Sequence, residues 1–333
     1  MDKKALILLL LLLSSAAWSG CTKEDYSNCP AGLYVTFAPE NPKHNYARDV
    51  QNLELYFYKD DALAGSIHYT RDELRAGDRA AYIPNEAIAG GRYRMVAVVN
   101  SGEDSRTATR STDSYERIHT AMVDEVVDYQ PCNFFSGEAE ITVPEVPDNI
   151  TVTEVPVSLY KHNNRIRINI YHDEDYTPEG RIDARVEDIS GKYFHARTRA
   201  GFRPDDFQRT VFKPWERLDG RDGSVLYLST MHMWHSTSPD GETRLCIDES
   251  GATRAGGSIR SFSLNMTELL RKVSKVVLRD ENGGETVLLN PYDTDEKLRF
   301  HDEYEISIKL GKTTVAVRVG LDDWQTVGGG IDL

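Results

Sequence analysis

Short segments in which apolar and polar residues alternate recur along most of this 333-residue chain. The pattern is strictest in residues 165–172, where Ile166, Ile168 and Ile170 are separated by polar residues. Side chains of a β-strand point alternately to opposite faces of the sheet, so a period of two is typical of a half-buried strand. Because turn-forming residues separate the segments, we predict an all-β fold. Strands are expected near residues 31–38, 50–58, 65–69, 79–83, 92–100, 134–143, 151–160, 165–172, 181–188, 193–198, 208–213, 224–231, 243–248, 258–264, 274–279, 285–290, 303–310 and 313–319.

The length of the chain bears on how many domains it forms. A chain of 333 residues is longer than most single domains, which favours two. We predict two tandem β-sandwich domains, residues 31–160 and 161–333, joined near residues 160–164.

One segment of the first half, residues 114–128, departs from the period of two. Its apolar residues recur every three or four positions, as on one face of an α-helix. Asp113 precedes the segment and is a candidate N-cap. We therefore predict one short amphipathic helix that lies on a sheet. The residues of its apolar face are Tyr115, Ile118, Met122 and Val126.

The N-terminus has the three parts of a secretory signal peptide. Lys3 and Lys4 precede an apolar run at residues 5–13, and mostly small residues at 14–20 lead to Cys21. The apolar run is shorter than the roughly 20 residues that span a bilayer. We predict that cleavage after this segment leaves Cys21 as a lipidated first residue.

Lipidation would make the N-terminus a membrane attachment, with residues 1–20 as the lipoprotein signal peptide and residues 21–30 as a lipidated acidic linker. The formal net charge of −14 does not favour binding to anionic lipid, so the acyl chains would have to supply the membrane affinity. In the alternative interpretation, an ordinary signal peptide is cut near Ala17 or Gly20, and Cys21 is a plain thiol.

Three further cysteines, Cys29, Cys132 and Cys246, follow Cys21. An exported chain enters a compartment in which disulfides form, and three cysteines allow one bond and one remaining thiol. A Cys29–Cys132 disulfide would lie within the first half, and a Cys29–Cys246 disulfide would join the two halves. We favour Cys29–Cys132, with three free buried thiols as the alternative.

Composition and motifs argue against nucleic-acid binding and enzymatic activity. The acidic charge is spread along the chain without a basic stripe, whereas nucleic acid is bound largely through lysine and arginine contacts to phosphate. The chain contains no HExxH, GxSxG, P-loop or GxGxxG motif. We therefore expect no enzymatic activity, no catalytic residues, no cofactor and no nucleic-acid partner.

Two segments have weak features of a metal site. His232 and His235 lie three positions apart, which in a strand places them on opposite faces. The segment 219–223, DGRDG, lacks the ligand spacing and the closing glutamate of a calcium loop. We expect a strand end and a turn at these places, and no metal site.

Several segments, in their order along the chain, resemble one family. Cys29-Pro30 is followed by the strand LYVTF, and the strand LELYFYKDDAL (53–63) ends in an acidic turn. Further matching segments are GGRYRMVAVVN (90–100), FFSGEAEITV (134–143), VPVSLYKHNNRIRINI (155–170), FKPW (212–215) and YEISIKLGKTTVAVRVGLDDW (304–324). On these segments the chain resembles the FimB/Mfa2 family of Bacteroidetes fimbrial anchor subunits.

The resemblance implies two transthyretin-like β-sandwich domains and a lipid anchor in the outer membrane. It also implies a place at the base of a fimbria, where the anchor tethers the shaft and limits its assembly. The acidic residues after Lys23 are similar to the signal that sends Bacteroidetes lipoproteins to the cell surface. The expected partners are the outer membrane, through the N-terminal lipid, and a fimbrial shaft subunit. The alternative function is that of a surface glycan-binding lipoprotein of an outer-membrane uptake system.

Subunits of such fimbriae join by donor-strand exchange, in which a strand of one subunit completes the sheet of another. The donor is expected within residues 313–333. The candidate strand is residues 313–319, where Val315, Val317 and Val319 alternate with other residues, and the alternative donor is a flexible tail of residues 325–333. In the alternative interpretation, residues 313–319 are the second strand of the last hairpin.

Overall fold

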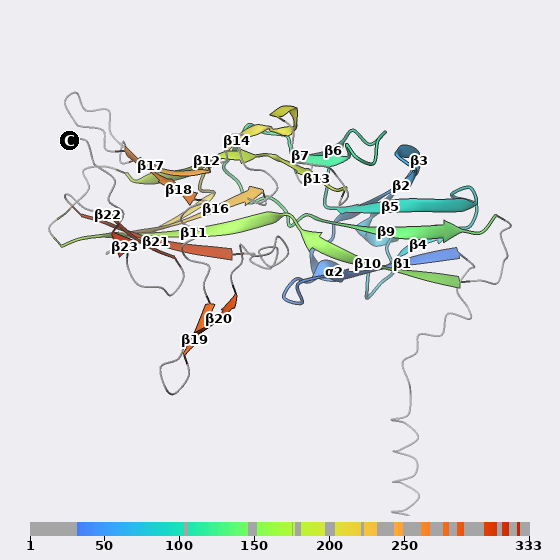
Figure 1. The fold of residues 1–333 in the computed structure, drawn as a ribbon, viewed down its shortest axis with the longest axis horizontal. Coiled ribbons are helices and arrows are strands. Elements are labelled where there is room, and N and C mark those ends of the chain that lie inside the picture. Colours follow the sequence, from blue (N-terminus) through green and yellow to red (C-terminus); the bar gives the residue numbers. More distant parts are fainter. Residues whose placement is uncertain are drawn as a thin grey trace, which may run out of the picture.

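The computed structural model is predominantly β, which confirms the all-β prediction (Figure 1). The seven-stranded sheet lies at one end of the long axis of Figure 1, and the six- and five-stranded sheets lie at the other. The structure describes residues 32–102, 106–145, 152–174, 176, 181–196, 204–220, 223–231, 243–248, 261–266, 276–279, 285–289, 303–311, 315–319 and 325–326.

The first half of the chain forms a seven-stranded sheet in the order β3-β2-β5-β9-β10-β1-β4. Alternate residues of these strands meet in one core, in which Leu53, Leu55 and Phe57 of β2 are fully buried. The strands are β1 (Gly32–Pro39), β2 (Asn52–Lys59), β3 (Ala62–Thr70), β4 (Ala81–Pro84), β5 (Gly91–Val99), β9 (Phe135–Val143) and β10 (Val152–Lys161).

The sheet curls round this core because β10 changes partners along its length. Its first eight residues pair in parallel with β1, whereas Tyr160 and Lys161 pair antiparallel with β9. Across the core, the Tyr69 hydroxyl of edge strand β3 donates a hydrogen bond of 2.6 Å to the backbone carbonyl of Tyr82 in edge strand β4. The two edges of the sheet are thus joined by a side chain rather than by a strand ladder.

A second core lies between the six-stranded sheet, of order β15-β16-β11-β21-β22-β23, and the five-stranded sheet, of order β18-β17-β12-β14-β8. Ile166, Ile168 and Ile170 are buried in it, as their alternation predicts. The strands of the six-stranded sheet are β11 (Asn163–His172), β15 (Glu216–Gly220), β16 (Gly223–Met231), β21 (Glu303–Leu310), β22 (Val315–Val319) and β23 (Gln325–Thr326). Those of the five-stranded sheet are β8 (Val126–Val127), β12 (Asp183–Ser190), β14 (Arg209–Phe212), β17 (Arg244–Asp248) and β18 (Ser261–Asn265).

The remaining strands form a three-stranded sheet of order β13-β7-β6 and a hairpin of β19 and β20. The other short elements are the helix α2 and two 3-10 turns, η2 and η4. Their bounds are β6 (Thr107–Arg110), β7 (His119–Met122), β13 (Lys192–Phe194), β19 (Val276–Arg279), β20 (Glu285–Leu289), α2 (Tyr46–Asp49), η2 (Arg71–Glu73) and η4 (Pro204–Asp206).

The predicted helix at residues 114–128 is wrong. After a turn at Ser114–Ile118, the segment continues as β7 and β8. All four residues of β7 are buried, including the polar His119 and Thr120, and Met122 packs in the second core. Burial on both faces removes the period of two from the sequence, and the spacing of apolar residues then matches a helix by coincidence.

The segment that was predicted to be helical also covers the second face of β2. Tyr56 and Tyr58 point away from the main core, yet they are only 8% and 0% exposed. Tyr115 and Ile118 pack with them in a third apolar cluster. The alternation in β2 therefore identified the strand correctly, but its second face is not solvated.

The predicted boundary between residues 160 and 161 falls at the end of β10, directly before β11. Two strand pairs join the halves on either side of it. β8 of the first half pairs with β14, and β13 of the second half pairs with β7. The division into two tandem transthyretin-like domains stays a prediction.

Candidate functional site

The candidate donor residues lie in β22, which is an internal strand of the six-stranded sheet. It pairs with β21 over five residues on one side and with β23 at Ala316 and Val317 on the other. Val315 and Val317 point into the second core, and Val317 is 1% exposed. The side chain of Val319 lies outside the described residues. Donation of β22 to another subunit would therefore remove two valines from the core of this chain.

The N-terminal predictions concern residues outside the described part of the structure. These are the signal peptide at residues 1–20, the lipidation site Cys21 and the linker with Cys29. Cys132 is exposed and Cys246 is partly buried, and neither forms a disulfide within the described part of the chain. Burial raises the pKa of the Cys246 thiol, which lies 3.7 Å from a carboxylate oxygen of Glu187. The two described cysteines are not bonded to each other, and the pairing of Cys29 stays a prediction.

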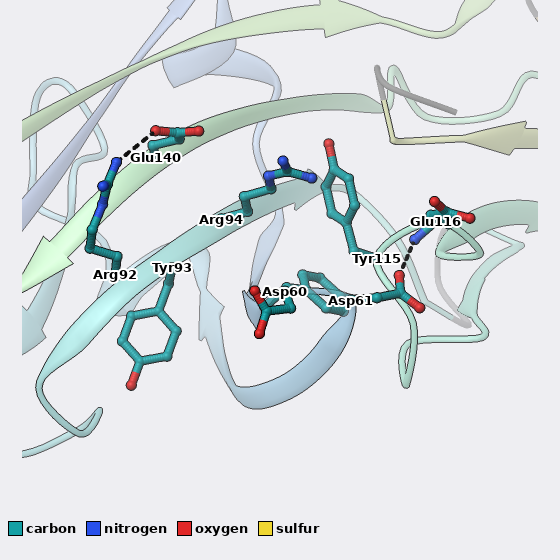
Figure 2. A pocket seen from close by; sticks show the side chains of 9 residues that line it. Asp60, Asp61, Arg92, Tyr93, Arg94, Tyr115, Glu116 and Glu140 are labelled. Carbon is teal, nitrogen blue, oxygen red and sulfur yellow. Dashed lines mark hydrogen bonds and ion pairs between the residues drawn. The ribbon is translucent and has the colours of Figure 1, made fainter. Parts of the chain in front are cut away.

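A surface pocket of about 370 Å³ lies where the β2–β3 turn meets β5 and β9 (Figure 2). Arg92 of β5 pairs with Glu140 of β9 at 3.5 Å. The guanidinium of Arg94, two residues along β5, lies 4.9 Å from the ring centre of Tyr115. The acidic turn residues Asp60 and Asp61 also line this pocket (Figure 2).

The aromatic groups of this first pocket are already bound within the protein. The hydroxyls of Tyr58, Tyr93 and Tyr115 donate to the Thr112 carbonyl, the Ala89 carbonyl and the Glu138 carboxylate, at 2.9, 2.8 and 2.6 Å. All three tyrosines are buried, so the pocket offers no open aromatic face.

Asp61 holds the turn that the sequence had suggested as a helix start. Its carboxylate accepts hydrogen bonds from the backbone N–H of Glu116 at 2.9 Å and from the hydroxyl of Ser114 at 2.8 Å. These donors lower the pKa of Asp61, the Glu116 backbone N–H most of all. The turn is therefore capped by a residue 53 positions earlier in the sequence rather than by Asp113.

A second pocket, of about 400 Å³, lies beside β15 and the outer face of β12 and β17. We call it the Trp215 pocket. The indole of Trp215 is half-buried, and its Nε1 donates to the Ser229 hydroxyl at 3.3 Å. Tyr227 stacks against the indole with ring centres 5.7 Å apart, and the guanidinium of Arg165 lies 5.3 Å from the indole centre.

Charges of both signs surround the indole and cancel in number. The cations are Arg181, Arg185, Lys213 and Arg217, and the carboxylates are Asp128, Asp183, Glu216 and Asp248. Asp183 is held by Arg181 and Arg217, at 3.1 and 3.3 Å. Lys213, Asp128 and Glu216 are exposed, and within the described part of the chain their side chains make no hydrogen bond or ion pair.

A buried polar cluster lies where the two halves of the chain meet. The Ser136 hydroxyl of β9 lies 2.6 Å from Nε2 of His162 and 2.8 Å from Nδ1 of His195. Nε2 of His195 lies 2.8 Å from the hydroxyl of Thr120 in β7. The ring of His162 also stacks on Tyr193 of β13, with centres 3.5 Å apart. We call these five residues the joint cluster.

Burial in the joint cluster opposes a positive charge on the imidazole of His195. Full burial, with a smaller contribution from His119, lowers the pKa of His195 from 6.5 to about 3. A neutral imidazole has one donor and one acceptor nitrogen, and the hydroxyls of Ser136 and Thr120 can match both. Serine and histidine lie together here without a carboxylate and away from solvent, so the arrangement suits a structural role.

Neither of the two segments with weak metal-site character was predicted to bind a metal. His232 and His235 lie outside the described residues. β15 ends at Gly220 and β16 begins at Gly223, and the two strands pair antiparallel. The Asp219 carboxylate binds Arg217 and Ser224. Within the described part of the chain, no three histidine, cysteine or acidic residues gather as metal ligands. None of the described helices has the length and apolar character needed to cross a membrane.

The sequence matches the family described as "Fimbrillin-A associated anchor proteins Mfa1 and Mfa2" over residues 26–328. No curated protein matches it. The fold is similar to that of the fimbrial anchor protein Mfa2 from Porphyromonas gingivalis, with 15% identity, a TM-score of 0.55 and coverage of 91% of this chain and 99% of that one.

Two other solved structures also share the fold. A candidate adhesin from Bacteroides ovatus is 15% identical, with a TM-score of 0.66 and coverage of 90% of this chain and 96% of that one. A candidate polysaccharide-binding protein from Bacteroides thetaiotaomicron is 16% identical, with a TM-score of 0.61 and coverage of 88% and 98%.

Proposed function

Because the chain belongs to the family of fimbrillin-A associated anchor proteins Mfa1 and Mfa2, we propose that it tethers a fimbria to the outer membrane and limits the assembly of the shaft. The observation that carries the proposal is the family match, which begins at residue 26, five residues after Cys21. A lipid on Cys21 would hold the chain at the cell surface. The body of the protein would then bind the shaft subunit.

The tether is tested by the substitution Cys21→Ser in cells that make fimbriae. Loss of the lipid leaves no membrane anchor at the N-terminus, so we expect the protein and the attached fimbriae in the medium. Cys246→Ser is the matched control, because it removes a cysteine that takes no part in the predicted lipidation or disulfide and should leave the protein in the membrane fraction. Retention of Cys21→Ser in the membrane would exclude a lipid tether at this residue.

The proposed joint with the shaft lies at the C-terminal edge of the six-stranded sheet. The described sheet order ends at β23, a two-residue strand that pairs with Ala316 and Val317 of β22. A sheet edge can accept an extended segment from another subunit, or the residues after β22 can themselves be donated. The core valines of β22 would then stay in place.

Deletion of residues 325–333 tests this proposed contact with the shaft without removing core residues, because it removes β23 and keeps β22. We expect the deletion variant to fold, to remain in the membrane and to release fimbriae into the medium. A variant that retains fimbriae of normal length on the cell would place the joint elsewhere. Unchanged fimbriae in a complete knockout would instead favour the role of a surface glycan-binding lipoprotein.

A further inference from the structure

The Trp215 pocket combines an aromatic surface with uncommitted polar groups, whereas the first pocket does not. Tyr227 and Arg165 contact the indole ring and hold it in place. Neither of these two residues lines the cavity. The bond from Nε1 to Ser229 fixes the orientation of the ring further. A rigid aromatic surface can pack against a ligand with little loss of side-chain entropy.

The polar rim of the pocket indicates the charge of its ligand. Four cationic and four anionic side chains line the cavity, so their formal charges cancel and neither an anion nor a cation is favoured. Carboxylates only accept hydrogen bonds, and guanidinium and ammonium groups only donate them. A ligand that uses both kinds of group must carry donors and acceptors in close succession, as neighbouring hydroxyls do.

Three polar side chains of the rim are available to such a ligand. Lys213, Asp128 and Glu216 are exposed, and none of them forms a side-chain hydrogen bond or ion pair with another described residue. Asp183 is positioned by two arginines, and a carboxylate has further acceptor sites beyond those two bonds. These four rim groups are therefore either preorganised or unoccupied.

From these features we propose that the Trp215 pocket binds a neutral carbohydrate, with the C–H face of one pyranose ring against the indole. The hydroxyls of that ring lie among the carboxylates and cations of the rim. The volume of about 400 Å³ falls in the range of small-molecule sites. The proposal is independent of the membrane tether, so its failure leaves the anchor function untouched.

Saturation-transfer NMR on the full-length protein tests the proposal. The probes are glucose, galactose, mannose, fucose and N-acetylglucosamine, with N-acetylneuraminate as the charged comparison. We expect transfer to the ring C–H protons of at least one neutral sugar, and a loss of at least tenfold in affinity in Trp215→Ala. Absence of transfer to every neutral sugar, or binding of N-acetylneuraminate alone, would overturn the proposal.

Two further variants separate binding from folding. Asp128→Ala removes an exposed acceptor that makes no internal side-chain bond, so we expect weaker sugar binding with an unchanged unfolding temperature. Tyr171→Ala removes an exposed aromatic residue of β11 that does not line the pocket, and it should bind sugar as the wild type does. If Trp215→Ala does not fold, Trp215→Phe and Asp128→Ala decide the outcome. Wild-type affinity in both would contradict the proposal.

Discussion

Ser136 and His195, 59 positions apart in the sequence, share a buried hydrogen bond of 2.8 Å where the two halves of the chain meet. The same hydroxyl also contacts His162, and His195 in turn contacts Thr120. The Ser136 hydroxyl of β9 in the seven-stranded sheet thus links His162, which lies between β10 and β11, to His195, which follows β13. The joint cluster therefore couples the packing of the two halves.

Acidification should weaken the fold through His195. Its pKa is about 3 in the folded protein and 6.5 in its ordinary state, so below pH 6.5 the unfolded chain binds a proton that the folded chain does not. Stability from this group is complete above pH 6.5 and falls as the pH is lowered toward 3, by up to about 1.4 kcal/mol per pH unit. Between pH 7 and pH 5, we expect a loss of roughly 2 kcal/mol from this residue.

Chemical denaturation of the wild type and of His195→Gln at pH 7 and pH 5 separates the loss of stability due to His195 from the loss due to titration of the carboxylates. Glutamine keeps one donor and one acceptor but does not ionise between pH 7 and pH 5. We expect the free energy of unfolding to fall less in the variant than in the wild type. Equal losses would show that His195 is not held neutral by burial.

Ser136→Ala should destabilise the protein, because it removes the shared partner of two buried imidazoles. A buried polar group that loses its partner costs roughly 1–3 kcal/mol. The control is Ser66→Ala on β3, where the serine is exposed and the change should fall within about 0.5 kcal/mol. Urea denaturation of both variants measures the difference, and similar midpoints would argue against a structural role for the joint cluster.

Gly137→Ala tests the close approach of β9 and β10. A Cβ atom at this position would overlap the Ser158 carbonyl oxygen and lie 2.7 Å from Cγ1 of Val157. Overpacking of this kind costs typically about 1–3 kcal/mol. The matched control is Gly65→Ala on β3, where no atom lies within 4 Å of the added carbon. Thermal unfolding should show a lower midpoint for Gly137→Ala alone, and equal midpoints would mean that β10 can move away without loss.

The proposed Cys29–Cys132 disulfide can be tested in protein isolated from membranes without reductant. Peptide mapping should recover the two cysteines in one cross-linked peptide and Cys246 as a free thiol. Cys29→Ser should then make the exposed Cys132 reactive toward iodoacetamide. Labelling of Cys132 in the unaltered protein would exclude the pairing.

The strands could be predicted where one face of a strand is buried and the other is not. The isoleucines of β11 and the leucines of β2 lie in the cores as their alternation indicates. β7 could not be recognised in this way, because all four of its residues are buried. Its neighbours β6 and β13 come from positions that local sequence patterns do not connect.

Among the functional features too, those with a local sequence pattern could be predicted, and those that depend on distant contacts could not. The family could be recognised from the order of its segments, and Trp215 stands within the FKPW segment that contributed to the resemblance. The joint cluster was missed because Ser136, His162 and His195 are isolated polar residues in the sequence. Only the pairing of β7 with β13 brings His195 to Thr120, and no local spacing signals that contact.

The parallel pairing of β1 with β10 has a mechanical consequence for a chain held by its N-terminus. With the N-terminus fixed, a tensile force on the fimbria would act on β1 from Gly32 onward. This strand is flanked by β10 on one side and by β4 on the other. A load directed along a strand shears all of its ladder bonds together, whereas a load across the strand breaks them one after another. If the proposed lipid on Cys21 holds the N-terminus, the first strand would resist extraction by force, because all eight of its residues pair with β10.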